Sequence, residues 1–130
     1  MQPEEAANVF AMMRELWPDF DDDLHGEQVI VWEQADGALG GFVSFSIRPW
    51  GNGCDARPVP YVEGWWVAPA LRRGGVGRAL IAAVEQWAKM CGFRELGSDA
   101  QLDNKIGRDA HAAVGFEETE RMVFFRKKLR

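Results

Sequence analysis

The sequence predicts an α/β domain in which a mixed sheet carries helices on its faces. Three observations lead to this fold class. Apolar residues recur every three or four positions in some segments, as helices require, and other short segments read as strands. The pair Asp36-Gly37 is typical of a hairpin turn between two of these strands. The segments follow one another in the order α-β-β-β-α-β-α-β, and 130 residues suffice for a single domain, residues 1–130, with one core.

The individual elements are bounded by residues that helices and strands avoid. Pro18 should end the first helix, because the residue before a proline is kept out of the helical region. Gly92 should end the longest helix in a left-handed conformation. In chain order we expect a helix at about 4–17, strands at 28–34, 39–48 and 61–67, a helix at 76–91, a strand at 94–99, a helix at 104–113 and a strand at 117–128.

Composition and charge exclude several classes of protein. The formal net charge of −5 argues against a general nucleic-acid binder, because a phosphate backbone requires a surplus of Lys and Arg. No apolar run approaches the ~18 residues of a membrane span, and the N-terminus lacks a signal-peptide pattern. Cys54 and Cys91 lie far apart and outside any CxxC spacing. We therefore expect neither a metal site nor a disulfide framework, and a reduced cytoplasmic protein.

One strongly acidic run stands near the start of the chain, where residues 19–23 read Asp-Phe-Asp-Asp-Asp. Such a run is usually a solvated loop. A second interpretation is a lip that attracts a cationic substrate.

A glycine-rich turn joins the strand at 61–67 to the helix at 76–91, and residues 72–77 read Arg-Arg-Gly-Gly-Val-Gly. Glycines allow the backbone to turn tightly, and the first turn of a helix presents unpaired N–H groups to an anion. This order of strand, turn and helix is typical of a phosphate site, to which Arg72, Arg73 and Arg78 would add positive charge. The alternative is a plain turn with surface arginines. Neither the P-loop nor the dinucleotide fingerprint matches.

The pattern Arg72-x-x-Gly75-x-Gly77 resembles the acetyl-CoA signature of the GNAT superfamily of N-acetyltransferases. Asn104 opens a helix that ends at Val114-Gly115-Phe116, which resembles the closing element of that family. The resemblance implies a mostly antiparallel sheet, splayed in the middle and here lacking the usual first strand. It also implies acetyl-CoA as acetyl donor, bound by Trp66, Val67, Arg72, Arg73, Gly74, Gly75, Val76, Gly77, Arg78 and Asn104.

A narrower resemblance covers most of the chain from about Glu15 onward. The stretches that carry it are Leu16-Trp17-Pro18, Asn52-Gly53-Cys54-Asp55, Glu63-Gly64, Ser98-Asp99 and Gly-Phe-Glu-Glu-Thr-Glu-Arg at 115–121. They resemble aminoglycoside 6′-N-acetyltransferases. The implied function is direct acetylation of an aminoglycoside antibiotic at its 6′-amine, without a covalent enzyme intermediate, by a homodimer. Two alternatives stay open: acetylation of another small polyamine or a peptide amine, and a CoA-binding module without catalysis.

Three residues are candidates for the chemistry. Glu63 lies on the strand beside the expected thioester position, and Asp99 ends the next expected strand. The resemblance places both at substrate-binding positions, where one would act as base for the attacking amine. The alternative for each is an ordinary carboxylate at a strand end. His111 stands where many family members carry a Tyr that assists the leaving thiolate, and a packing role is the alternative.

The family pattern also implies a task for the backbone of Val67, whose N–H would polarise the thioester carbonyl. Trp17 and Trp50 fall at a helix end and in a loop, where an aromatic face suits a sugar ring or an ammonium group. We therefore expect both tryptophans to contact the acceptor.

Overall fold

The computed structural model describes residues 6–16, 19, 21 and 23–130. The chain divides into two compact units, one ending at Asp99 and one spanning Ala100–Arg130. A single domain over residues 1–130 stays a prediction. None of the helices in the described part of the chain combines the length and the hydrophobicity that a membrane span requires.

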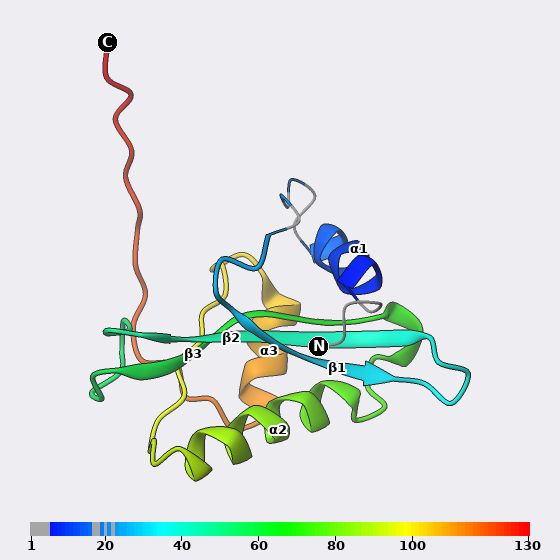
Figure 1. The fold of residues 1–130 in the computed structure, drawn as a ribbon. Coiled ribbons are helices and arrows are strands. Elements are labelled where there is room, and N and C mark those ends of the chain that lie inside the picture. Colours follow the sequence, from blue (N-terminus) through cyan, green and yellow to red (C-terminus); the bar gives the residue numbers. More distant parts are fainter. Residues whose placement is uncertain (1–5, 17–18, 20, 22) are drawn as a thin grey trace. The chain divides into compact units, whose positions relative to one another are not determined.

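The first unit contains the sheet and two helices. Its elements are α1 (Ala6–Leu16), β1 (Gln28–Glu33), β2 (Leu39–Arg48), β3 (Val59–Val67), the short 3₁₀ turn η2 (Pro69–Leu71) and α2 (Val76–Met90). The three strands form an antiparallel sheet in the order β1-β2-β3. Figure 1 shows α1 on one face of this sheet and α2 on the other. The expected α/β class, with helices on both faces of a mostly antiparallel sheet, is confirmed.

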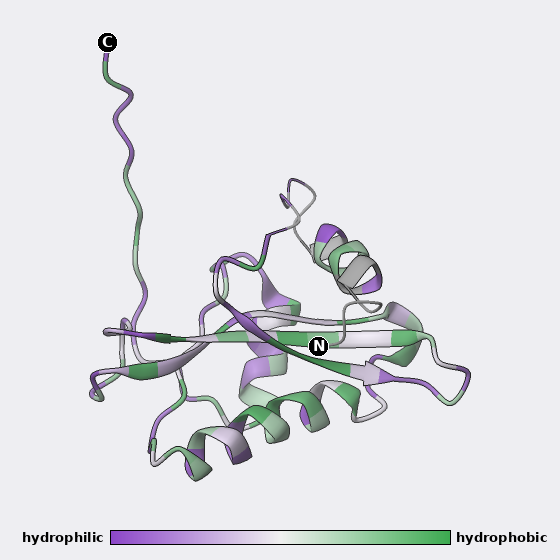
Figure 2. Cartoon of the chain, viewed as in Figure 1, coloured by the Kyte–Doolittle hydropathy of each residue, from purple (hydrophilic) through white to green (hydrophobic). Residues whose placement is uncertain are grey.

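Alternation along β2 explains how the sheet holds both helices. Phe42 points to one face and packs against Met12 and Met13 of α1. Phe45 points to the other face, where its ring lies 4.8 Å from that of Trp87 on α2. The predicted apolar stripe of α2 is buried at Val76, Leu80, Ile81, Val84 and Ala88. Figure 2 shows the apolar residues of α2 gathered towards the sheet.

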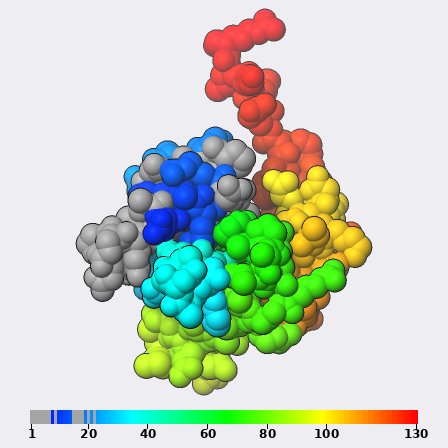
Figure 3. All heavy atoms as spheres, turned by 90° about the vertical axis from the view of Figure 1, so that its right-hand side faces the viewer, coloured from blue at the N-terminus to red at the C-terminus, as the bar shows by residue number. Residues whose placement is uncertain are grey.

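The hairpin between β1 and β2 forms as the Asp36-Gly37 pair predicts. The amide of Gln34 donates to the carbonyl of Ala38 at 2.8 Å, and Gly37 has a φ of +85°. The end of this hairpin meets η2, because the amide of Ala68 donates to the carbonyl of Gly40 at 2.8 Å. The hairpin (cyan) and the segment that follows β3 (green) accordingly lie side by side in Figure 3.

β3 starts two residues before the expected position and contains a β-bulge. Ser44 pairs with Gly64 but Phe45 pairs with Val62, so that Glu63 is the extra residue on β3. A bulge shifts the alternation of side chains on its own strand. As a result Glu63 lies on the α1 side, beside residues of β2, while Trp65 lies against the start of α2.

The strand expected at 94–99 is reduced to one parallel bridge between Tyr61 and Gly97. The amide of Val62 donates to Gly97 at 2.8 Å, and the amide of Gly97 donates to Pro60 at 2.9 Å. A Cβ at position 97 would lie 2.6 Å from the Tyr61 ring, so only glycine allows this close approach. Within the described residues no further bridge continues the pairing, and the edge of β3 beyond Val62 is open.

The second unit contains α3 (Lys105–Ala113) and a terminal segment, residues 117–130. The strand expected at 117–128 is wrong: this segment has no regular secondary structure and its residues are exposed. A strand exists only with a partner for its backbone groups, and within the described residues no backbone hydrogen bond joins this segment to another. Among the described residues, which begin at Ala6, no strand precedes α1.

Candidate functional site

The glycine-rich turn adopts the left-handed conformations that its sequence predicts. Arg73 has a φ of +67°, and Gly75, the N-cap of α2, has a φ of +90°. The amide of Ala79 donates to the carbonyl of Gly75 at 3.0 Å, so the amides of the turn precede the helical ladder. Gly77 also packs closely, because a Cβ there would lie 3.2 Å from the ring of Trp65, and its contact with a donor stays a prediction.

The end of β3 leads directly into this turn. Nε of Arg72 donates to the carbonyl of Val67 at 2.8 Å, so this guanidinium is anchored to the strand rather than mobile. The amide of Ala68 points towards β2, where it reaches Gly40. Neighbouring amides along a strand point in opposite directions, so the N–H of Val67 points to the open edge of β3. The role of the Val67 N–H towards a thioester stays a prediction.

The other residues expected to bind the donor differ in exposure. Arg73, Gly74 and Arg78 are exposed at the turn. Val76 is buried in the core stripe of α2, so any contact with a donor comes from its backbone. Trp66 is half-buried and packs against the core cluster beneath α1.

Glu63 lies at the centre of a hydrogen-bonded cluster on the α1 side of the sheet. Its Oε1 accepts from Oγ of Ser46 at 2.8 Å and from Nε of Arg48 at 2.7 Å. Its Oε2 accepts from Nη2 of Arg48 at 2.6 Å. Ser46 and Arg48 are two residues apart on β2 and therefore face the same side. Glu63 is thus held by a two-pronged ion pair rather than facing solvent alone.

This pairing sets the ionisation of the cluster. Burial by itself would raise the pKa of Glu63, but the hydrogen bonds from Arg48 and Ser46 and the charge of Arg48 outweigh it and lower the pKa. Burial raises the pKa of the nearby Glu27, and the charge of Glu63 raises it further. A carboxylate with a lowered pKa is a weak base, so Glu63 suits binding and orientation better than proton abstraction.

Asp99 joins the same cluster through Tyr61. The Tyr61 hydroxyl donates to Oδ2 of Asp99 at 2.8 Å. The guanidinium carbon of Arg48 lies 3.7 Å from the centre of the Tyr61 ring, a cation–π contact. Burial, followed by the hydrogen bond to Asp99, raises the pKa of Tyr61, so the phenol remains protonated and donates. The structure therefore brings the two predicted acceptor carboxylates into one network.

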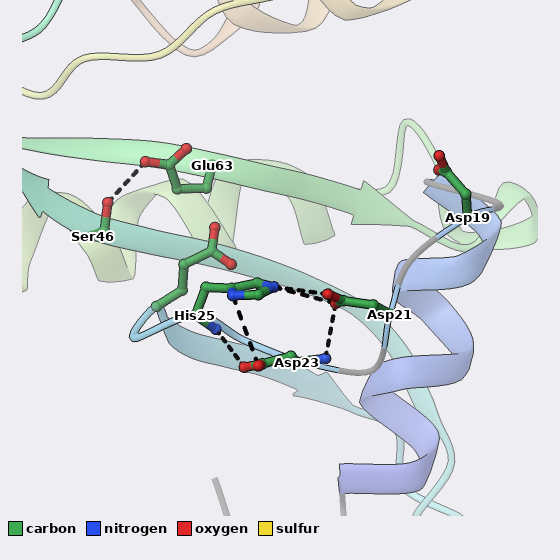
Figure 4. Close-up of a pocket in the computed structure, with 7 residues that line it drawn as sticks. Asp19, Asp21, Asp23, His25, Ser46 and Glu63 are labelled. Carbon is green, nitrogen blue, oxygen red and sulfur yellow. Dashed lines mark hydrogen bonds and ion pairs between the residues drawn. The ribbon is translucent and has the colours of Figure 1, made fainter.

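A pocket of about 450 Å³ opens beside this cluster (Figure 4). Five carboxylates of the described residues line its walls. Three come from the acidic run, one lies just before β1, and one is Glu63 on β3. The lining residues are Asp19, Asp21, Asp23, His25, Glu27, Ser46 and Glu63. The described acidic residues of the run, Asp19, Asp21 and Asp23, therefore line a cavity, and attraction of a cationic substrate stays a prediction.

His25 is the cationic counterpart within this pocket. Its Nε2 lies 3.0 Å from Oδ2 of Asp21, and its Nδ1 lies 3.7 Å from Oδ2 of Asp23 (Figure 4). The hydrogen bond to Asp21, and then the charge of Asp23, raises the pKa of His25. The same hydrogen bond lowers the pKa of Asp21. Protonation of His25 therefore changes the charge that the pocket offers a cation.

Asn104 and His111 belong to the second unit and have local roles there. Oδ1 of Asn104 accepts from the amide of Gly107 at 2.9 Å and caps α3. Nδ1 of His111 lies 2.6 Å from the carbonyl of Gly107 and must carry the hydrogen, because a carbonyl only accepts. The His111 ring lies 5.1 Å from that of Phe116. The predicted roles of Asn104 towards the donor and of His111 as acid stay predictions.

Of the two tryptophans expected to contact the acceptor, the structure describes only Trp50. Trp17 lies outside the residues that the structure describes. Trp50 follows β2 and is 55% exposed, so its ring is accessible to a ligand. Its contact with an acceptor stays a prediction.

Five residues of the cluster and pocket escaped the sequence reasoning: Ser46, Arg48, Tyr61, His25 and Glu27. Arg48 could have been noticed as a charge ending an apolar strand, and His25 as a cation in an acidic stretch. Nothing in the local pattern pairs them with their carboxylates. Among the described residues no group of three or more His, Cys, Asp or Glu could hold a metal ion.

Similarity to known proteins agrees with this geometry. The sequence model of the acetyltransferase (GNAT) family matches residues 3–116. Aminoglycoside N(6′)-acetyltransferase type 1 of Salmonella typhimurium is 42% identical over 128 residues, covering 90% of this chain and 88% of that protein. The corresponding protein of Stenotrophomonas maltophilia is 41% identical, covering 98% of this chain and 90% of that protein.

Solved structures show the same likeness. AAC(6′)-Iy in complex with the bisubstrate analogue CoA-S-monomethyl-acetylneamine superposes with a TM-score of 0.88 at 37% identity, covering 99% of this chain and 95% of that chain. AAC(6′)-IG from Acinetobacter haemolyticus superposes with a TM-score of 0.89 at 32% identity, covering 100% of this chain and 97% of that chain. From the family match over residues 3–116 and from these relatives, the chain belongs to the acetyltransferase (GNAT) family.

Proposed function

We propose that the protein transfers the acetyl group of acetyl-CoA directly to the 6′-amine of an aminoglycoside, without a covalent enzyme intermediate. One observation carries the proposal: β3 presents a turn suited to an anion at one end and an acid-lined pocket four residues earlier, at Glu63. Four residues of strand span about 13 Å. A phosphate-bearing donor and a cationic acceptor therefore approach one another along the same strand.

The donor end fits the diphosphate of CoA. The turn before α2 has left-handed backbone at Gly75 and amides that precede the helical ladder, which is how helix N-termini bind phosphate. The open edge of β3 leaves backbone groups near Val67 for the pantetheine arm. Acetyl-CoA supplies the activated acetyl thioester. The relative AAC(6′)-Iy has been solved with CoA, which agrees with this assignment.

The acceptor end fits a molecule with several ammonium groups. Among the described residues, five carboxylates line the pocket and only His25 of this lining is a potential cation. Such a wall concentrates polycations electrostatically and holds them with charge-assisted hydrogen bonds. A peptide amine brings one positive charge, which could balance only one of these carboxylates. The pocket therefore favours an aminoglycoside over a peptide.

The chemistry requires an unprotonated amine and a polarised thioester. The amine nitrogen forms a bond to the acetyl carbon while the carbon–sulfur bond breaks; the amine loses a proton and the thiolate gains one. We assign the binding of the ammonium form to the Glu63–Asp99 network, with Asp99 or water taking the proton. The N–H of Val67 would stabilise the developing oxyanion. His111 would protonate the thiolate.

We further propose that the protein is a homodimer acting in the cytoplasm. The terminal segment exposes Val123, Phe124, Phe125 and Leu129 by 75% or more. Apolar side chains gathered in this way are typical of a surface that another chain covers. Both cysteines are free thiols, as a reducing compartment maintains them.

The test is an acetyl-CoA thiol-release assay with neamine, an aminoglycoside that carries a 6′-hydroxyl in place of the amine, a linear polyamine and a peptide. We expect rapid release with neamine and at least a hundredfold less with the other three. Preference for the linear polyamine or the peptide would establish the corresponding alternative acceptor. Binding of acetyl-CoA without thiol release on any acceptor would establish the non-catalytic module.

A further inference from the structure

Arg48 is the one cation that the described residues place on Glu63. Its guanidinium donates to both carboxylate oxygens, at 2.7 and 2.6 Å, and the two side chains are 38% and 18% exposed. The planar fork of an arginine matches a carboxylate better than any other side chain does. The charge of Glu63 is thus cancelled by a partner within the same unit of the protein.

The hydrogen-bonding capacity of Glu63 is also nearly used. A carboxylate offers about four lone-pair positions, two on each oxygen. Ser46 and Arg48 occupy both positions of Oε1, and Arg48 occupies one of Oε2. Only one position on Oε2 remains. A single N–H of an acceptor can be oriented there, but the remaining hydrogens of an ammonium group need other partners.

Asp99 is in the opposite situation. Within the described residues its carboxylate accepts one hydrogen bond, from the neutral Tyr61 hydroxyl, and the side chain is exposed. Arg48 contacts the face of the Tyr61 ring but donates to Glu63. Glu63, Arg48 and Asp99 together therefore carry one net negative charge, and it resides on Asp99.

We propose that Arg48 is a positioning and specificity-determining residue: it neutralises Glu63 and holds it as an oriented hydrogen-bond acceptor, which leaves Asp99 as the counter-charge of the acceptor's reacting ammonium. The inference rests on the proposed function. It gives separate roles to the two carboxylates, which the sequence analysis placed together at substrate-binding positions. Glu63 orients the amine and Asp99 binds its charge.

Four variants with neamine as acceptor test the proposal. Glu63→Gln leaves the charge of Arg48 uncompensated, so the KM for neamine should rise ten- to a hundredfold. Arg48→Gln frees the charge of Glu63, so KM should fall severalfold, while kcat falls about tenfold because the carboxylate loses its orientation. The double variant removes both charges, and its KM should return to within about threefold of wild type. Asp99→Asn alone should raise the KM for neamine ten- to a hundredfold.

Three controls accompany these measurements. Lys89→Gln removes one positive charge from α2, on the opposite face of the sheet, and should change neither parameter. Acetyl-CoA affinity and melting temperature report whether each variant is folded. Arg48→Lys keeps the charge but loses the fork, so it should retain the wild-type KM and show the lower kcat; it still tests the orientation of Glu63 if Arg48→Gln does not fold.

A second readout is independent of the acceptor. Carbon-13 titration of the Glu63 carboxyl should show its pKa below the usual range in wild type, and raised in Arg48→Gln because burial then acts without compensation. The charged or titratable groups around Glu63 in this experiment are Arg48 of β2, Tyr61 of β3, Asp99, and His25 and Glu27 just before β1.

The outcomes distinguish a failure of this inference from a failure of the proposed function. If the double variant keeps the high KM of Glu63→Gln, Glu63 itself binds the ammonium and the inference is wrong. An unchanged KM in Asp99→Asn, or an unchanged Glu63 pKa in Arg48→Gln, contradicts it as well. A wild-type protein that acetylates no aminoglycoside removes the proposed function, and the inference with it.

Discussion

The turn before α2 allows the sharpest test of donor binding, through Gly75→Val. Gly75 has a φ of +90°, and a Cβ added there would meet nothing within 4 Å. The cost of the substitution is therefore conformational, about 1–2 kcal/mol for an L-residue in the left-handed region. With an unfolding entropy of about 2.1 cal/mol/K per residue, the 130 residues give about 0.27 kcal/mol/K. The melting temperature should fall by about 4–7 °C.

The second effect concerns the ligand. Acetyl-CoA at a hundred times its Kd stabilises the wild-type fold by about 2.7 kcal/mol, which raises the melting temperature by about 10 °C on the same scale. In Gly75→Val the turn can no longer direct its amides at the diphosphate, so most of this shift should be lost. Differential scanning fluorimetry with and without acetyl-CoA measures both effects.

Gly92→Val is the matched control. Gly92 lies at the other end of α2 with a φ of +88°, and a Cβ there also meets nothing within 4 Å. It should therefore lower the melting temperature by a similar amount and keep the full acetyl-CoA shift. If Gly75→Val retains that shift, the turn does not bind the diphosphate and the reasoning from its backbone is refuted.

Three further predictions concern the rest of the site and the terminal segment. His111→Phe should lower kcat more than it raises the KM for neamine, and an unchanged kcat in stopped-flow turnover would return His111 to a packing role. Because the folded-state pKa of His25 is raised, the protonated imidazole stabilises the folded protein. This stabilisation is complete below the ordinary pKa of 6.5 and is lost as the pH rises through the folded-state pKa. Proton NMR should show this pKa return towards 6.5 in Asp21→Asn, and no change there would remove Asp21 as the cause. Light scattering should give a dimer mass for wild type and a monomer mass after Phe124→Ser and Phe125→Ser; a monomeric wild type would contradict the dimer.

Elements whose signals are local were predictable. The hairpin needs only Asp36-Gly37, and the long helix needs its apolar spacing and the glycine that ends it. Asn104 was correctly placed at the start of a helix, because a cap depends on a residue three positions away. In each case the decisive contacts lie within a few positions of the residue that shows the pattern.

The two wrong strands failed for a different reason. Residues 94–99 and 117–128 were expected to form strands from their place in the order of elements, but a strand is stable only where another segment pairs with its backbone. Gly97 meets β3 at a single bridge, and the terminal segment pairs with nothing among the described residues. A local stretch reports a tendency, whereas pairing depends on the distant segment.

The sequence by itself indicated the family and singled out the glycine-rich turn, Glu63 and Asp99 as candidates, because glycines, a helix start and acidic residues express their chemistry within short stretches. Only the tertiary structure shows that Arg48 pairs with Glu63 and that Tyr61 pairs with Asp99. Arg48 and Glu63 are 15 residues apart, and they meet because β2 and β3 pair in one register with a bulge at Glu63. A register shifted by one residue would turn Arg48 to the other face of the sheet. The neutralisation of Glu63 by Arg48 is therefore a property of strand pairing, which no local pattern encodes.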